Sequence, residues 1–257
     1  MEELERLYAA AVDHHRQKHL REAYFAYWDV LRRDPPAPLS EDQRTAVRRH
    51  LPRLYITPAE PLPLKAAAVI VHPARHEIAY HLFWEDDIDF ADDQEPCDHE
   101  VIWVAHDGAG RVVRVQAYYH GFIASSAPAV EEANAQGGRP RYEVQWGKHG
   151  SLPWGWQGLY DGRILADMEA THRRLHEQGR RDQDNPLTRE WPRRFGGSWA
   201  DFVDFRAPVD LGTWVEREGA AWASRWGNGV IATHVLRYNF CPKHDWPEFA
   251  QRGTAGS

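Results

Sequence analysis

The chain has 257 residues, of which 42% are hydrophobic and 27% charged, a composition typical of a globular protein with a substantial core. Its formal net charge of −7 argues against a nucleic-acid partner, because phosphate binding needs a clustered basic face. No apolar run reaches the roughly 18 residues of a membrane span. Two distant cysteines and a charged N-terminus predict a cytoplasmic protein. The sequence indicates no oligomeric state.

The first fifty residues are expected to be helical. Apolar residues recur at helical spacing in two segments, and a proline pair ends the second of them. A capping box at Ser40 and Gln43 predicts a third helix. The predicted helices cover residues 2–18, 20–33 and 40–49. We therefore expect a helical N-terminal segment over residues 1–56 and a second domain over residues 57–257.

Strand-like segments follow a proline-rich connection at residues 57–63. The predicted strands are 66–71, 77–84, 100–106, 111–119, 141–147 and 230–238. Residues 107–110 join two of them as a hairpin, which predicts antiparallel pairing. Residues 130–140 are predicted to form a polar loop, and residues 164–178 a helix that ends at Gly179. This order predicts an α+β fold.

The segment 85–100 holds nine carboxylates in sixteen residues, between two apolar stretches. Crowded carboxylates repel one another unless a cation lies among them, and hard divalent cations prefer oxygen ligands. Asp98 and Glu100 are two residues apart on a predicted strand, so their side chains should share a face. We expect them to ligate Ca²⁺, Mg²⁺ or Mn²⁺; the alternative is a solvated acidic loop. The candidates for a further ligand are Asp86, Asp87 and Asp89.

Two histidines each follow an apolar strand and precede a glycine. They are His120, in Tyr-Tyr-His-Gly, and His149, in Trp-Gly-Lys-His-Gly. A neutral imidazole could ligate the metal or act as a general base on metal-bound water, so both are candidate catalytic residues. The alternative is a polar residue that marks the end of a strand.

Two tryptophans near His149 form a second candidate feature. Trp154 and Trp156 could make a stacking platform for a sugar or another planar ligand, and the alternative is core packing. These residues are the predicted substrate-binding positions.

Four segments together resemble the necrosis- and ethylene-inducing-like proteins and the similar vacuolar-protein-sorting-associated β-sandwich proteins. The segments are residues 79–87, 97–104, 118–121 and 144–151. The resemblance covers about residues 55–155 and implies an antiparallel β-sandwich that holds a divalent cation in a surface cavity. It implies that Asp98 and Glu100 are ligands and that Asp86 or Asp87 is the upstream ligand. His99 stands where the family has tryptophan.

Together these features predict a metal-binding β-sandwich domain at residues 57–257, preceded by helices. The expected activity is that of a metal-dependent hydrolase or lyase acting on a small, oxygen-rich molecule. The alternative is a non-catalytic protein that binds a sugar or lipid headgroup through the cation. A third possibility is a purely structural ion that neutralises the acidic loop.

Overall fold

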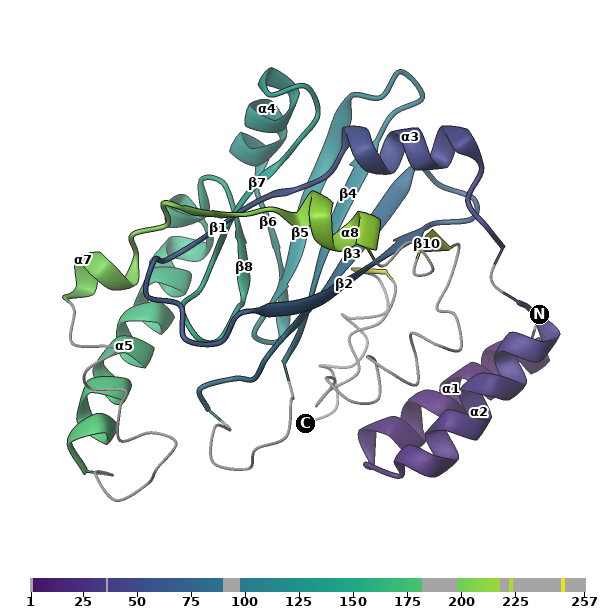
Figure 1. Cartoon of the computed structure of the whole chain (residues 1–257), viewed down its shortest axis with the longest axis horizontal. Coiled ribbons are helices and arrows are strands. Elements are labelled where there is room, and N and C mark those ends of the chain that lie inside the picture. The colour runs from purple at the N-terminus through teal and green to yellow at the C-terminus, as the bar shows by residue number, and fades with distance from the viewer. Residues whose placement is uncertain are drawn as a thin grey trace.

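A computed structural model gives the structure of the chain. It describes residues 2–35, 37–89, 98–181, 198–217, 222–223 and 246–247. This part of the chain combines helices with two β-sheets, and the helical start that the sequence predicts is confirmed (Figure 1). The mixed α and β composition is therefore confirmed.

The larger sheet has six strands in the order β10-β2-β3-β4-β5-β6, and the smaller has four in the order β8-β7-β1-β9. The strands of the larger sheet are β2 (Leu64–Val71), β3 (Glu77–Trp84), β4 (His99–His106), β5 (Val112–Tyr119), β6 (Phe122–Ser125) and β10 (Trp222–Ala223). Those of the smaller sheet are β1 (Arg53–Ile56), β7 (Arg141–Val144), β8 (Ser151–Pro153) and β9 (Ala207–Val209). Consecutive strands from β2 to β6 pair antiparallel, as predicted, whereas β1–β7 and β2–β10 are parallel.

The α-helices confirm most of the predicted segments. They are α1 (Glu2–Arg16), α2 (Leu20–Arg33), α3 (Glu41–Arg49), α4 (Ala127–Ala135), α5 (Arg163–Arg181), α7 (Trp199–Phe202) and α8 (Leu211–Arg217). Two short 3₁₀ helices, η1 (Trp156–Gly158) and η2 (Tyr160–Gly162), precede α5. The predicted capping box is present, with Ser40 Oγ accepting from Gln43 N and Gln43 Oε1 accepting from Ser40 N. Helix α5 continues through Gly179, two residues further than predicted.

Helix α4 corrects the prediction of a polar loop at residues 130–140. Ser126 caps the helix by accepting a hydrogen bond from Ala129 N at 3.2 Å, and Pro128 lies in the first turn. Ala129 and Ala133 are one turn apart and fully buried, so small residues rather than large apolar ones attach this helix to the core. The predicted strand at 230–238 lies outside the described residues.

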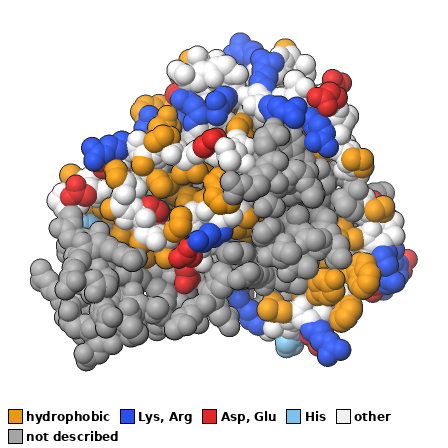
Figure 2. Space-filling model, viewed as in Figure 1, with side chains coloured by type: hydrophobic (Ala, Val, Ile, Leu, Met, Phe, Trp, Pro, Cys, Tyr) orange, Lys and Arg blue, Asp and Glu red, His pale blue; other side chains and the backbone are white. Residues whose placement is uncertain are grey.

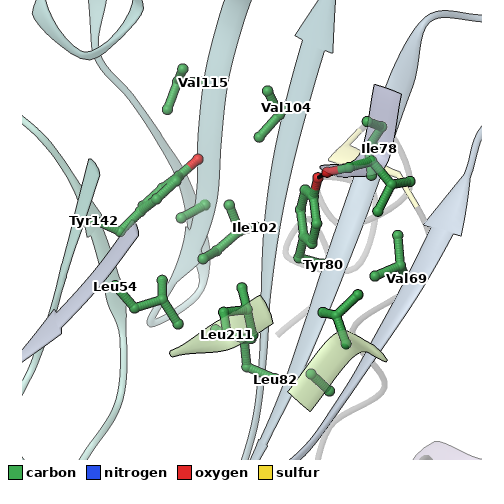
Figure 3. Packing of buried hydrophobic residues seen from close by; sticks show 14 of the residues in the cluster. Leu54, Val69, Ile78, Tyr80, Leu82, Ile102, Val104, Val115, Tyr142 and Leu211 are labelled. Carbon is green, nitrogen blue, oxygen red and sulfur yellow. Dashed lines mark hydrogen bonds between the residues drawn. The ribbon is translucent and has the colours of Figure 1, made fainter. Parts of the chain in front are cut away.

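The main core lies between the two sheets (Figure 3). It unites Tyr80 and Ile102 of the larger sheet with Leu54 and Tyr142 of the smaller one. The tyrosine hydroxyls are satisfied by backbone carbonyls, since Tyr80 donates to Val47 O and Tyr142 donates to Gln116 O, both at 2.9 Å. Side chains from α3, α4 and α8 complete this cluster.

A second buried cluster lies on the opposite face of the larger sheet. It contains Val101 and Trp103 of β4 together with Ala23 and Tyr27 of α2. Strand β4 therefore alternates between two cores, with even-numbered residues facing the smaller sheet. The α1–α2 hairpin also carries exposed apolar side chains beside its basic residues (Figure 2). None of the helices in the described ranges is long and apolar enough to cross a membrane.

Candidate functional site

The candidate site lies where β3 ends and β4 begins, on the side of the larger sheet that faces the smaller one. Trp84 N donates to Asp98 O at 3.0 Å, and Leu82 is paired with Glu100 in the register. Asp98 and Glu100 are only 4% and 2% exposed, although both are acidic. They belong to the even-numbered set of β4, as the alternation of a strand predicts.

His149 occupies the centre of this buried cluster. Its Nδ1 is hydrogen-bonded to Asp98 Oδ2, and its Nε2 lies 3.1 Å from Glu60 Oε1. The indole of Trp84 stacks on the imidazole with 4.3 Å between ring centroids and 5° between planes. Burial alone would lower the pKa of His149, but the charges and hydrogen bonds of Glu60 and Asp98 raise it to about 10. His149 is therefore an imidazolium at neutral pH.

Glu60 is the site residue that the sequence did not identify. Its side chain is 2% exposed, and besides His149 it accepts hydrogen bonds from Gly147 N at 2.9 Å and Leu62 N at 3.0 Å. The only signal was a single acidic residue within the proline-rich segment 57–63. Its partner lies 89 residues further along the chain, so local pattern could not reveal the contact.

The turn that carries His149 is attached to its surroundings by hydrogen bonds to backbone carbonyls. Trp146 Nε1 donates to Ala59 O at 2.9 Å, and Ile88 N donates to Gly147 O at 3.0 Å. Gly147 has a φ of +65°, and a Cβ placed there would lie 2.6 Å from Ile88 Cγ2. Glycine is required at this position because the acidic segment after β3 packs directly on its backbone.

The three aspartates after β3 have different surroundings. Burial, followed by the charge of Asp98, raises the pKa of Asp87 to about 7. Asp86 accepts a hydrogen bond from Asp87 N at 2.8 Å. Asp89 is ion-paired with Lys148 at 3.0 Å and with Arg174 of α5. The carboxyl of Asp87 is electrostatically coupled to Asp98 and His149.

His120 reaches the same turn from the end of β5. Its Nε2 is hydrogen-bonded to Gln145 Oε1, and Gln145 O accepts from His149 N at 3.0 Å. A Cβ on Gly150 would lie 2.8 Å from the Tyr119 ring and 3.1 Å from His120 Nε2. Both histidines have positive φ, 41° for His120 and 51° for His149, a backbone conformation that is enriched at functional sites. The structure thus brings the two predicted catalytic histidines to one turn.

The two tryptophans proposed for stacking lie at the other end of β8. Trp156 is 2% exposed and donates from Nε1 to Glu143 Oε2 at 2.7 Å. Trp154 is 37% exposed, and its ring lies 4.5 Å from the guanidinium carbon of Arg141. Neither has a recorded contact with His149 or Asp98 in the structure.

The donor atoms of the site are mainly carboxylate oxygens. Across the described residues, no three His, Cys, Asp or Glu side chains are already arranged around one metal position. Asp98 and Glu60 are instead turned toward the His149 ring. Residues 90–97 of the acidic segment, with Glu95 and Cys97, lie outside the described part.

Comparisons with protein-family models, with curated proteins and with solved structures find no match. The chemistry of the residues and their geometry therefore carry the functional argument.

Proposed function

We propose that this chain binds a divalent cation through Asp87, Asp98 and Glu100 and uses it in hydrolase- or lyase-type chemistry on a small, oxygen-rich substrate. One observation supports this above all: the carboxylates of Asp87, Asp98 and Glu60 interact with the single imidazolium of His149, and a fourth carboxylate, that of Glu100, is buried two residues after Asp98. The excess of negative charge calls for further positive charge in a buried place.

The composition of the cluster fits a hard cation. Ca²⁺, Mg²⁺ and Mn²⁺ take oxygen ligands, and carboxylates are the strongest of these in proteins. The raised pKa of Asp87 also supports a cation site, because it reflects burial near another carboxylate rather than neutralisation by a nearby base. Glu60 contributes differently, since its two oxygens already accept from His149, Gly147 and Leu62.

The residues of the chain divide into positioning and proton-transfer roles. A bound cation would polarise a substrate oxygen or lower the pKa of a bound water. His149 fixes the orientation of Asp98 through Nδ1, and Glu60 fixes the ring through Nε2. Because His149 is already protonated at neutral pH, it cannot serve as the base. His120 is half-buried and is hydrogen-bonded to the uncharged amide of Gln145, and it reaches the same turn as His149, so we assign proton transfer to it.

We also infer that the two sheets form a β-sandwich with the site at one end. The support is the shared buried cluster, in which Leu54 and Tyr142 of the smaller sheet meet Tyr80 and Ile102 of the larger one. The parallel β1–β7 pair makes the smaller sheet mixed rather than purely antiparallel.

Calorimetric titration of chelator-treated protein with Ca²⁺, Mg²⁺ and Mn²⁺ tests the cation site. We expect the wild type to bind at least one of these ions and its melting temperature to rise with ion concentration. Asp98→Asn should lose most of the affinity. Asp13→Asn, which alters an exposed aspartate of α1, should behave as the wild type. A wild type that binds none of the three ions, or an Asp98→Asn variant with unchanged affinity, would contradict the proposal.

A further inference from the structure

Two buried N–H donors next to His149 have no hydrogen-bond acceptor among the described residues. They are Nε1 of Trp84 and Nε2 of Gln145. Both side chains are fully buried. Buried polar groups are nearly always paired, and leaving one unpaired costs about 1–3 kcal/mol. Two such donors, one stacked on His149 and the other in the turn that carries it, therefore require an explanation.

Both donors are held in place by contacts that leave the N–H group available. The Trp84 ring stacks on His149, which fixes the plane of the indole but uses neither nitrogen of the imidazole. The Gln145 amide is oriented by the bond between its Oε1 and His120 Nε2, so that its nitrogen is turned away from His120. An indole N–H can only donate, which makes an acceptor atom the fitting partner.

We infer that the ligand of the cation site carries an oxyanion, a phosphate or a carboxylate group, that accepts hydrogen bonds from Trp84 and Gln145. This deepens the proposed function and rests on it, because the carboxylates of Asp87, Asp98 and Glu100 would repel an anion unless a cation lies between them. Hydrogen bonds to an anionic oxygen are about twice as strong as those to a neutral one, so these two donors select an anion over a hydroxyl.

The positive groups of the site agree with this assignment. His149 has Trp84 stacked on its ring face and carboxylates at its ring nitrogens, and Lys148 precedes it in the same turn. Lys148 is ion-paired with Asp89 and 14% exposed, so it contributes charge from the rim rather than a direct contact. The cation, the imidazolium and the two N–H groups would together surround the oxyanion.

The test uses the full chain after chelator treatment and titrates in two steps. Mg²⁺, Ca²⁺ or Mn²⁺ alone is titrated first, which tests the proposed function by itself. Inorganic phosphate and acetate are then titrated, in separate experiments, into protein loaded with the ion that it binds. Binding of phosphate alone identifies a phosphate-bearing ligand, binding of acetate alone a carboxylate-bearing one, and either result supports the inference.

Two variants connect binding to the named donors. Trp84→Phe keeps a ring against His149 and removes only the N–H, and Gln145→Met removes the amide without adding charge. Each should lower the affinity for the anion about tenfold while the affinity for the cation is retained. Trp28→Phe, at an exposed tryptophan of α2, is the matched control and should bind as the wild type. The second donor keeps the test decisive if one variant does not fold.

Three results would overturn the inference. One is a wild type that binds the cation but neither anion. Another is anion binding that persists with chelator present, because the cation would then have no bridging role. The last is anion affinity that is equal in wild type, Trp84→Phe and Gln145→Met. Failure of the cation titration itself would instead remove the proposed function, and this inference with it.

Discussion

His149 and His50 are both fully buried, yet their surroundings shift their pKa values in opposite directions. His149 lies between Asp98 and Glu60 and beneath the Trp84 ring. His50 follows α3, with its Nδ1 3.0 Å from Gly138 O and its ring stacked on His106 at 4.5 Å. No carboxylate is recorded against His50.

The pKa values follow these surroundings. Burial lowers the pKa of His50, the hydrogen bond to Gly138 O opposes this, and repulsion from His106 and Arg49 lowers the pKa further. The same burial acts on His149, but two carboxylates override it and raise its pKa to about 10. Depth of burial therefore does not decide whether a histidine is charged; the carboxylates against its ring do. The site is the region where the fold has placed a buried charge.

The largest expected effect is the loss of that charge. His149→Asn tolerates the positive φ of the position but leaves Asp98 and Glu60 buried without their cationic partner. We expect the free energy of unfolding of chelator-treated protein to fall by about 3–5 kcal/mol in urea titrations.

His50→Asn serves as the control, because it removes a buried ring that has no recorded carboxylate contact. The double variant Asp98→Asn/His149→Asn should recover part of the loss, since it removes one of the stranded charges. Equal losses in His149→Asn and His50→Asn would show that packing, and not charge, distinguishes the two sites.

The second prediction concerns pH. A histidine whose folded pKa is lowered favours the folded state above its unfolded value of about 6.5, and this stability is lost as pH falls below that value. His50 belongs to this class, with His106 beside it. A histidine whose folded pKa is raised stabilises fully below about 6.5 and loses this effect as pH rises toward its folded pKa. His149 belongs to the second class.

Unfolding free energies measured from about pH 5 to pH 9 should separate these two histidines. The free energy of unfolding should decline less steeply toward low pH in His50→Asn than in the wild type. The difference in slope should be at most about 1.4 kcal/mol per pH unit for one proton. In His149→Asn the free energy of unfolding should decline less steeply toward high pH than in the wild type. The assignment of charge states would be wrong if both variants altered the same limb of the profile.

The sequence predicted the elements whose signals are local. The capping box at Ser40 and Gln43, the alternation of β4 and the hairpin before β5 each depend on residues within a few positions of one another. The shared face of Asp98 and Glu100 follows from the same alternation. These features were accessible without any knowledge of the tertiary structure.

What the sequence could not reveal depends on long-range contacts. Glu60 becomes a site residue only because the turn at Gly147 docks onto it, a contact across 87 residues. Helix α4 lacks the large apolar stripe that marks a helix, since two alanines suffice where the helix lies close to the sheet. Nor could spacing reveal that the Asp87 carboxyl is coupled to Asp98, because that coupling depends on how the segment after β3 packs on the turn at Gly147.

The smallest expected effect lies at the rim of the site, where Asp89 pairs with Lys148 and Arg174. The side chains of Asp89 and Arg174 are 25% and 41% exposed, so water and salt screen their attraction far more than that of the buried pair at His149. Asp89→Asn should therefore lower the free energy of unfolding by no more than about 1 kcal/mol, and the loss should shrink at high salt. Urea titrations at low and high NaCl, with Asp13→Asn as the exposed control, measure both effects. A loss as large as that of His149→Asn, or one that salt does not reduce, would mean that the rim pairs hold the acidic segment as firmly as the buried charge does.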